Sequence, residues 1–211
     1  MRGIFITVEG PDGAGKTSVV KRLETLLKNE LGKETVVLTR EPGGIPIAEE
    51  IRKVILDPKN VEMDARTEAL LYAAARRQHL VERIIPALNE GKVILCDRFV
   101  DSSLAYQGAG RKIGMEPVLS INEFATEGLL PDLTLYLDVD SDTGLERIRR
   151  GRTVDQLDRL DQESAVFHQR VQHAYIKLAE QDPERIVTIN ARKDLNTVVT
   201  ECLKTIKGRF F

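Results

Sequence analysis

Residues 4–17 read Ile-Phe-Ile-Thr-Val-Glu-Gly-Pro-Asp-Gly-Ala-Gly-Lys-Thr, an apolar run that leads directly into the pattern G-x-x-x-x-G-K-T. This pattern is typical of a phosphate-binding P-loop, which requires a strand before it and a helix after it. Both are indicated, because residues 4–8 are β-branched and aromatic and apolar residues recur at helical spacing over residues 19–31. Glycines in such a loop adopt backbone angles that other residues avoid, so that successive N–H groups turn towards phosphate oxygens. The stretch therefore predicts a nucleoside triphosphate as the first ligand.

Individual residues of the loop have separate expected roles. Lys16 supplies a positive charge to the β- and γ-phosphates, and the Thr17 hydroxyl is placed to ligate Mg²⁺. The following helix adds its positive N-terminal end. Ser18 stands where the last glycine of a dinucleotide fingerprint would be, so the motif is not of that kind. The residues expected to bind the triphosphate are Gly10, Pro11, Asp12, Gly13, Ala14, Gly15, Lys16 and Thr17.

Length and composition point to one soluble domain. The 211 residues suffice for a single α/β domain over residues 1–211, and the net charge of −2 gives no sign of a nucleic-acid footprint. No apolar run approaches the roughly 18 residues needed to span a membrane, and no leader-like segment precedes the first strand. Two cysteines, Cys96 and Cys202, make no disulfide framework, and three scattered histidines form no zinc motif. We therefore expect a cytoplasmic protein that binds neither membrane nor nucleic acid.

Short apolar runs alternate with helical patterns along the whole chain. The expected strands cover residues 4–8, 35–39, 93–96, 133–139 and 186–189. The expected helices cover about residues 18–31, 46–56, 65–90, 103–109, 117–127, 142–150, 162–181 and 194–207. Continuous apolar strands separated by helices are typical of a mostly parallel sheet covered on both faces. The expected fold class is an open three-layer α/β/α P-loop fold with a five-stranded sheet.

Charged residues and glycines follow three of the expected strands. The first strand ends in Glu9 and the P-loop, the second in Thr-Arg-Glu-Pro-Gly-Gly at residues 39–44, and the third in Asp-Arg-Phe at residues 97–99. In open α/β sheets, ligands bind beyond the carboxyl ends of the strands. The three ends together favour one polar crevice over the sheet.

Asp97 follows an apolar strand and resembles a Walker B carboxylate. Its expected task is to hold Mg²⁺ or a metal-bound water, which we favour over an ion pair with a neighbouring arginine because a P-loop is present in the same chain. Arg98, next in sequence, offers a planar guanidinium suited to a phosphate.

Tyr72 and Arg76 lie one turn apart in an otherwise apolar helical segment and therefore share a face. An aromatic ring and a guanidinium in this arrangement can stack on a base and hydrogen-bond its edge. Taken alone, however, the pair is more typical of surface or interface packing.

Residues 146–161 are dense in charges of both signs, and Gly151 interrupts their helical pattern. Such a stretch is commonly a solvated helix face. The alternative is an arginine-bearing lid, at about residues 147–159, because phosphoryl transfer builds negative charge that arginines stabilise. The residues alone weigh equally for both interpretations. The arginines concerned are Arg147, Arg149, Arg150, Arg152 and Arg159.

Together these motifs resemble the bacterial thymidylate kinase family, a branch of the P-loop nucleoside monophosphate kinases, over nearly the whole chain. The P-loop alone would indicate only a superfamily, whereas the later segments are far more selective. The segments that carry the resemblance are residues 9–17, 39–44, 73–79, 97–108 and 159–163.

The resemblance implies transfer of the γ-phosphoryl group of ATP to thymidine monophosphate (dTMP) with Mg²⁺, by direct in-line displacement. Thr17 and Asp97 match the metal-holding positions. The residues that match catalytic positions are Lys16, Asp12, Arg98 and the lid arginines Arg149, Arg150 and Arg152. The residues that match the acceptor site are Arg40, Glu41, Pro42, Arg52, Tyr72, Arg76, Arg98, Ser103, Tyr106 and Gln107.

Within the acceptor site, the resemblance implies separate tasks. Arg40 and Arg98 would hold the acceptor phosphate, and Tyr72 would stack on thymine. Tyr106 would lie against the 2′ position of the sugar, where it leaves a hydroxyl no room. The residues that would read the base edge are Arg76, Ser103 and Gln107.

Three positions depart from the family pattern or distinguish its branches. Tyr72 stands where the family often has Phe, and Phe99 stands where it often has Tyr. Gly13 occupies the position at which the eukaryotic branch carries an arginine, so the lid arginines are expected to supply that charge. The resemblance also implies a homodimer.

Two alternatives remain to be tested. The first is a kinase for another nucleotide or for a deoxynucleoside. The second is a GTP-dependent switch or binding module, which normally shows N-K-x-D and, after the P-loop, D-x-x-G. Neither motif occurs here outside the P-loop itself.

Overall fold

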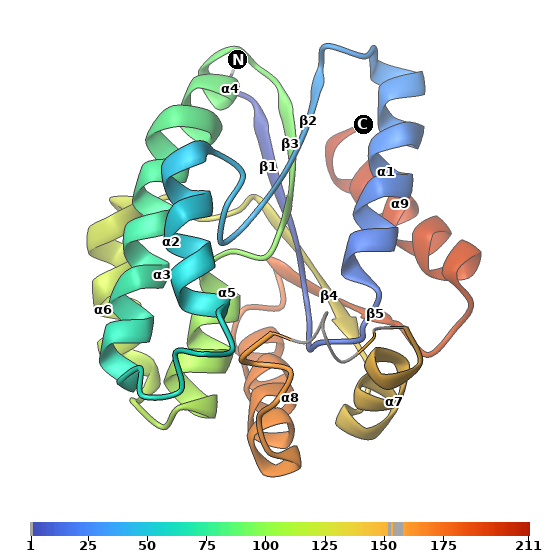
Figure 1. Cartoon of the computed structure of the whole chain (residues 1–211). Coiled ribbons are helices and arrows are strands. Elements are labelled where there is room, and N and C mark those ends of the chain that lie inside the picture. Colours follow the sequence, from blue (N-terminus) through green and yellow to red (C-terminus); the bar gives the residue numbers. More distant parts are fainter. Residues whose placement is uncertain (1, 152, 154–157) are drawn as a thin grey trace.

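The five expected strands form one sheet in the computed structural model, which describes residues 2–151, 153 and 158–211 (Figure 1). The strands are β1 (Ile4–Glu9), β2 (Val36–Arg40), β3 (Val93–Asp97), β4 (Leu133–Asp138) and β5 (Ile186–Asn190). Their order is β2-β3-β1-β4-β5, and every pair of neighbours is parallel. The expected strands are thus confirmed to within one residue at either end.

The helices begin and end close to the expected positions. They are α1 (Lys16–Leu31), α2 (Pro46–Leu56), α3 (Ala65–His79), α4 (Ile85–Asn89), α5 (Val100–Ser103), α6 (Met115–Thr126), α7 (Ser141–Gly151), α8 (Ala165–Gln181) and α9 (Leu195–Phe210). Two π-helical segments, η1 (Leu80–Ile84) and η2 (Leu104–Gly110), follow α3 and α5. Side chains cap four of the helices within the described ranges, because Asp64, Asp140, Ser164 and Asp194 accept hydrogen bonds from backbone N–H groups of the first turn.

The single helix expected over residues 65–90 is continuous but changes its winding. α3 passes into η1, and α4 carries Pro86 in its first turn. Proline lacks a backbone N–H and its ring crowds the carbonyl four residues earlier, so a regular α-helix does not run through it undisturbed. The wider π turn lies immediately before the proline. The helix expected over residues 103–109 likewise differs: it begins earlier, at Val100, and becomes η2.

Helices cover both faces of the sheet, which gives three layers (Figure 1). Successive side chains of a strand point to opposite faces. Phe5 joins the apolar core that contains residues of α3 and α8, whereas Ile6 joins the core that contains residues of α1 and α9. Both are fully buried. Because each face of the sheet is covered, its strands are apolar throughout rather than alternating, and the predicted α/β/α architecture is confirmed.

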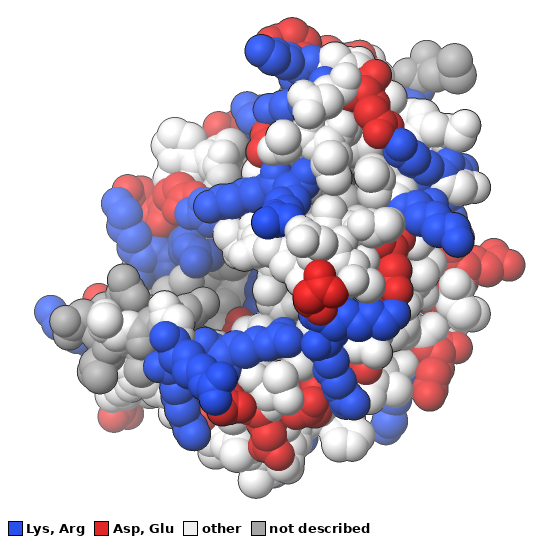
Figure 2. Space-filling model, turned by 90° about the vertical axis from the view of Figure 1, so that its right-hand side faces the viewer, with Lys and Arg blue, Asp and Glu red and all other residues white. Residues whose placement is uncertain are grey.

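Charges of both signs are interspersed on the face that carries α1 and α9, rather than gathered in one basic stripe (Figure 2). Within the described part of the chain, no helix combines the length and apolarity that a membrane span requires. The carboxyl ends of β1, β2 and β3 meet at the lower edge of the sheet in Figure 1, on the side of α7 and α8. This edge carries the polar residues that the sequence singles out.

Candidate active site

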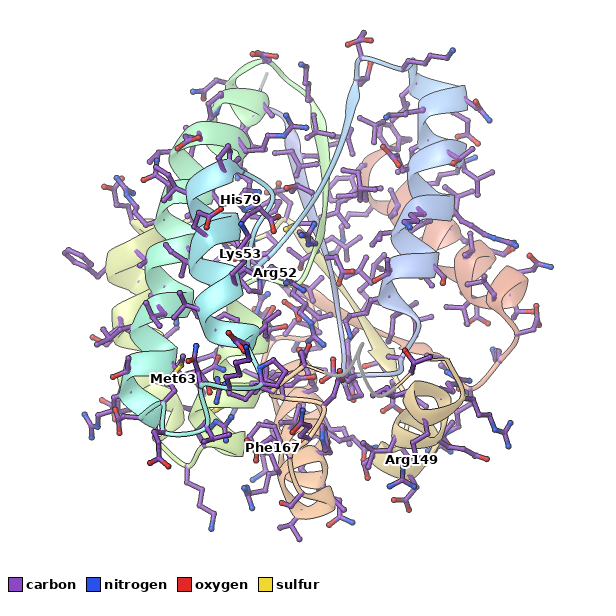
Figure 3. All side chains as sticks on the ribbon, viewed as in Figure 1. Arg52, Lys53, Met63, His79, Arg149 and Phe167 are labelled. Carbon is purple, nitrogen blue, oxygen red and sulfur yellow. The ribbon has the colours of Figure 1, made fainter. Side chains whose placement is uncertain are left out.

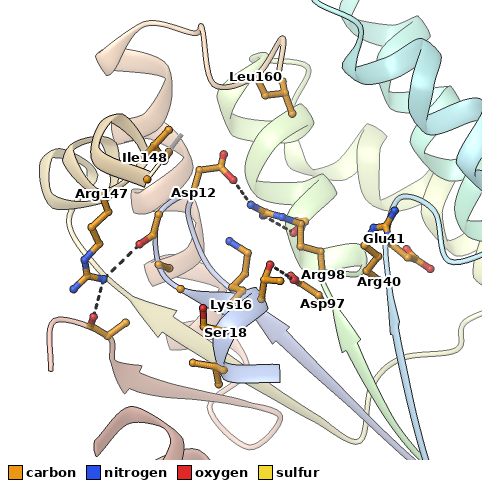
Figure 4. Close-up of a pocket in the computed structure, with 18 of the residues that line it drawn as sticks. Asp12, Lys16, Ser18, Arg40, Glu41, Asp97, Arg98, Arg147, Ile148 and Leu160 are labelled. Atoms are coloured by element: carbon orange, nitrogen blue, oxygen red, sulfur yellow. Dashed lines mark hydrogen bonds and ion pairs between the residues drawn. The ribbon is translucent and has the colours of Figure 1, made fainter. Parts of the chain in front are cut away.

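A cleft of about 710 Å³ opens at the carboxyl ends of the central strands (Figure 4). It brings together residues from the P-loop, β2, β3, α2, α3 and η2. The sequence-predicted residues that line it are Asp12, Gly13, Ala14, Gly15, Lys16, Thr17, Arg40, Glu41, Pro42, Arg52, Tyr72, Asp97, Arg98, Tyr106 and Gln107. The expected polar crevice is therefore present, with most of its predicted residues in one place.

The P-loop has the backbone that its glycines predict. Gly13 and Gly15 have φ angles of 77° and 87°, in the left-handed region that favours glycine. Gly13 also packs against α7, because a Cβ at this position would lie 2.1 Å from the carbonyl oxygen of Gly144. A Cβ on Gly144 would in turn lie 2.5 Å from the carbonyl oxygen of Asp12. The loop and α7 therefore touch backbone to backbone.

Lys16 is folded back onto the loop from which it projects. Its Nζ donates to the carbonyl oxygens of Gly10 at 2.9 Å and Pro11 at 2.8 Å, so these two loop residues contact Lys16 rather than line the cleft. Burial and the neighbouring Arg98 lower the pKa of the Lys16 ammonium to about 8. The N–H donors of Lys16 that bond to these carbonyl oxygens could bond to phosphate oxygens instead.

Thr17 and Asp97 both line the cleft, where Asp97 projects from the end of β3 (Figure 4). The Thr17 hydroxyl donates to Asp97 Oδ2 at 3.0 Å. No arginine or lysine of the described ranges forms an ion pair with Asp97, which counts against the structural ion-pair interpretation. A hydroxyl and a carboxylate side by side are oxygen ligands of the kind that Mg²⁺ prefers, together with waters and phosphates. The two residues therefore fit a magnesium ion.

Arg98 crosses from β3 to the P-loop. Its φ of 73° is unusual for a residue other than glycine, and its guanidinium donates to Asp12 Oδ1 at 2.5 Å. The Tyr106 hydroxyl donates to the other oxygen, Asp12 Oδ2, at 2.7 Å. Although burial opposes it, the charges of Arg98 and Lys16 hold the pKa of Asp12 down at about 2. Asp12 is therefore ionised and oriented within the cleft.

Glu9 lies beneath Arg98, at the end of β1. This fully buried carboxylate accepts hydrogen bonds from Phe99 N at 2.6 Å, Ser102 Oγ at 2.6 Å and Tyr175 OH at 2.9 Å. Burial, and then the nearby charge of Asp101, raise the pKa of Glu9 to about 7. The backbone bond to Phe99 holds the residue that follows the unusual turn at Arg98.

Arg76 lies below the wall of the cleft rather than at the surface, so its interpretation as surface packing is wrong. Its side chain is only 2 % exposed and pairs with Glu41 Oε2 at 2.7 Å. It also donates to Ser103 Oγ at 3.0 Å, to Asn122 Oδ1 and to the carbonyl oxygen of Phe99 at 2.9 Å. Neither Arg76 nor Ser103 lines the cleft directly.

Glu41, in contrast, does line the cleft while it serves this buried cluster. Its second oxygen, Oε1, lies 2.9 Å from Nδ1 of the fully buried His79. The other ring nitrogen of His79 lies 2.6 Å from Thr39 Oγ1. Tyr72, one turn before Arg76 on α3, lines the cleft itself with 9 % of its surface exposed.

The candidate lid arginines are not equivalent. Arg149 and Arg150 are exposed and do not line the cleft; Arg149 lies on the outer side of α7 (Figure 3), and Arg150 pairs with Glu146 on the same helix. Arg152 lies outside the described residues. Arg147 lines the cleft instead, and its guanidinium donates to the carbonyl oxygens of Ala191 at 3.0 Å and Gly13 at 3.4 Å.

Sequence reasoning missed a second group of cleft residues around β5 and α9. Residues 147 and 151 lie one turn apart on α7, and this spacing would have separated Arg147 from its exposed neighbours. The carboxyl end of β5 lies at the same edge of the sheet and also contributes to the cleft. The further cleft residues are Ser18, Val19, Leu56, Ser102, Ile148, Gly151, Asp158, Leu160, Ala191, Lys193, Asp194, Leu195 and Val198.

Comparisons with known proteins identify the family. A family model described as Thymidylate kinase matches residues 8–202. The chain belongs to the thymidylate kinase family. Among its relatives are proteins named Thymidylate kinase from Enterococcus faecalis, 66 % identical over 100 % of this chain and 98 % of the relative, and from Latilactobacillus sakei, 61 % identical over 98 % and 95 %.

A solved structure gives the same result for the family fold. The crystal structure of thymidylate kinase from Ehrlichia chaffeensis has a TM-score of 0.81 and 32 % identity, and the match covers 98 % of this chain and 100 % of that one. The fold of this chain is thus that of a thymidylate kinase structure.

Proposed function

We propose that this chain transfers the γ-phosphoryl group of ATP to dTMP in the presence of Mg²⁺, which gives ADP and dTDP for dTTP synthesis. The observation that carries the proposal is the single cleft that joins a P-loop with Lys16 and Thr17 to an aromatic and arginine-lined pocket around Tyr72 and Arg98. A phosphate donor and a nucleotide acceptor can occupy its two ends with their phosphates facing each other. We expect the activity in the cytoplasm.

The donor end suits ATP. The P-loop N–H groups and Lys16 would hold its phosphates. Beyond the loop, the cleft is lined by the apolar side chains of Val19, Leu195 and Val198, which suit a purine ring. Arg147, which already contacts the loop residue Gly13, completes this side.

The acceptor end suits a deoxynucleoside monophosphate. Arg40 and Arg98 offer guanidinium groups to the phosphate, and the Tyr106 ring limits the space next to the sugar. Tyr72 offers a ring on which a pyrimidine can stack, and Gln107 a side-chain amide for the base edge. Arg76 and Ser103 are buried behind the cleft wall. We therefore propose that they support the residues at the base edge from beneath.

The reaction needs little covalent chemistry from the protein. The acceptor phosphate is already a nucleophile, so positioning and charge neutralisation carry the catalysis. Thr17 and Asp97 would hold the magnesium ion, which screens the phosphate charges when bound. Lys16 would leave the loop carbonyls for the β- and γ-phosphates, while Arg98 and Asp12 keep the acceptor in line. From the family resemblance we also propose that Arg149, Arg150 and Arg152 supply positive charge to the transferred phosphoryl group.

We also propose a homodimer. Apolar side chains are exposed along α2, α3 and α6, which lie together on one side of the molecule (Figure 1), and the Phe124 side chain is 89 % exposed. A second copy of the chain would cover this face. Phe124→Asp is expected to convert a dimer of the wild type into a monomer in sedimentation velocity. A wild type that sediments as a monomer would refute the homodimer. The exposed apolar residues of these helices are Ile47, Val54, Leu70, Leu119 and Phe124.

The decisive experiment measures ADP release from ATP with a panel of nucleoside monophosphates and deoxynucleosides. We expect the highest kcat/KM with dTMP. A higher value for another acceptor would establish the alternative kinase. Tight GTP binding without transfer to any acceptor would instead support a switch or binding module.

A further inference from the structure

Glu68 is a fully buried carboxylate beneath the base end of the cleft, and the proposed reaction does not use it. It lies on α3, one turn before Tyr72. Three side chains donate to it: Gln107 Nε2 at 2.8 Å, Arg111 Nε at 3.1 Å and an N–H of the Arg159 guanidinium. Such a concentration of donors on one buried group calls for a role.

The partners of Glu68 determine what it can accept. It forms ion pairs with both Arg111 and Arg159, so its oxygens are the acceptors for two guanidinium groups. An ionised carboxylate only accepts hydrogen bonds, so the group of Gln107 that faces it must be the NH₂. The orientation of the Gln107 amide, which is otherwise ambiguous, therefore follows from the charge of Glu68.

Gln107 then presents its carbonyl oxygen away from Glu68. Gln107 lines the cleft, and no residue in the described ranges donates to its Oε1. A pyrimidine stacked on Tyr72 would thus meet a hydrogen-bond acceptor. Thymine and uracil carry an N3–H donor on this edge, whereas N3 of cytosine is itself an acceptor. Two facing acceptors in a buried site remain unpaired, which strongly disfavours binding.

We propose that Glu68 is a positioning residue that fixes Gln107 as a hydrogen-bond acceptor and thereby selects pyrimidines with an N3–H group. The inference rests on the proposed function, because it requires a deoxynucleoside monophosphate at the acceptor end. Arg159 supports the same arrangement from the other side: its Nε donates to the carbonyl oxygen of Ile55 at 2.9 Å, at the end of α2. The selectivity would therefore be built by residues behind the cleft wall as well as by those on it.

The test is Glu68→Gln, with kcat/KM measured for dTMP, dUMP and dCMP. The amide at position 68 can donate to Gln107 Oε1, so Gln107 can turn its NH₂ towards the cleft. We expect the dTMP:dCMP ratio of kcat/KM to fall about tenfold or more, because one buried hydrogen bond is exchanged for a mismatch. The dTMP:dUMP ratio should stay unchanged, since both bases carry N3–H. General damage to the fold would lower all three values together.

Asp101→Asn is the matched control. Asp101 is also a buried carboxylate on a guanidinium, that of Arg185, but its hydrogen-bond partners, Arg185 and Thr134, do not line the cleft. This variant should lower Tm without changing either ratio. If the wild type does not phosphorylate dTMP, the proposed function fails. If the wild type does so and Glu68→Gln keeps the dTMP:dCMP ratio, the positioning role alone is overturned.

A second measurement on the wild type covers the case in which Glu68→Gln does not fold. Glutamine labelled with ¹³C and ¹⁵N in the side chain reports both ends of the Gln107 amide by NMR, and Gln107→Asn assigns the signals. On addition of dTMP, we expect the carbonyl carbon to shift while the NH₂ protons, bonded to Glu68, keep their positions and slow exchange. A response confined to the NH₂ group would contradict the proposal.

Discussion

The two ends of the cleft hold their charges in different ways. At the acceptor end, charged side chains are buried and paired with one another: Glu41 and Arg76 are each 2 % exposed, and Glu68 is 0 % exposed beside Arg159. At the donor end, the Lys16 ammonium is satisfied by two carbonyl oxygens of its own loop. One end is fixed by distant parts of the chain, and the other by the loop itself.

This difference between the two ends indicates which of them rearranges when a ligand binds. Buried ion pairs form during folding, and removal of either partner destabilises the folded chain. The acceptor end is therefore preorganised for its ligand. The donors of Lys16 can instead pass from carbonyl oxygens to phosphates when a nucleotide arrives. We therefore expect changes at the acceptor end to affect stability and changes at the donor end to affect turnover.

Arg76→Ala should have the largest effect on stability. It leaves Glu41 buried without its guanidinium partner, which costs about 3–5 kcal/mol in the free energy of unfolding. Urea denaturation measures this, with Arg77→Ala as control, because Arg77 pairs with Glu127 at the surface. In the folded fraction, kcat/KM for dTMP should fall by about 1–3 kcal/mol of transition-state stabilisation. Unchanged stability would show that the acceptor end is not fixed by this pair.

Lys16→Ala should sharpen the contrast from the donor end. We expect kcat to fall about 10²- to 10³-fold, because a charge directed at the transferred phosphates is lost, while dTMP binding stays close to normal. Lys21→Ala, an exposed position on the same helix, serves as control. Single-turnover kinetics and calorimetric titration with dTMP separate the two effects. Near-normal turnover would remove Lys16 from the mechanism.

Glu9 predicts a pH dependence of stability. Because its pKa is raised to about 7 in the folded chain from 4.5, the protonated form is favoured by folding. Its contribution is therefore fully present below about pH 4.5 and is lost as the pH rises through 7, with a total on the order of 3 kcal/mol. Denaturation between pH 4.5 and 8 should show this slope in the wild type and not in Glu9→Gln. Equal slopes would place the proton elsewhere.

Arg147→Ala tests the smaller effect within α7. Arg147 reaches Ala191 and Gly13, so we expect KM for ATP to rise about five- to tenfold, the value of one hydrogen bond of about 1 kcal/mol. Arg150→Ala, whose side chain is 78 % exposed, should change stability by less than about 0.5 kcal/mol. A larger loss of kcat in Arg150→Ala than in Arg147→Ala would support the lid role proposed for Arg150.

The sequence predicted those parts of the site that depend on local pattern. The P-loop, the strand boundaries and the polar residues after β1, β2 and β3 follow from spacing and apolarity along the chain, and the cleft contains them. The sheet order brings the three strand ends together because parallel strands with helical crossovers leave their carboxyl ends at one edge.

The parts that could not be predicted depend on pairing between distant segments. Glu68 and Arg159 are 91 positions apart, and Glu41 and Arg76 are 35 apart, so no local pattern marks them as partners. Arg147 is a different case, because helical phase distinguishes it from its exposed neighbours whereas composition does not. Burial of charge is decided by tertiary packing.

The contact between Gly13 and Gly144 has a mechanical consequence. Side chains in a packed interface can change rotamer and so absorb small movements. Here main chain contacts main chain, and no side chain lies between Gly13 and Gly144. If the loop moves when it binds a triphosphate, α7 would therefore move with it by a similar amount. Arg147, which lies on α7 and donates to Gly13, would then change position when the nucleotide binds.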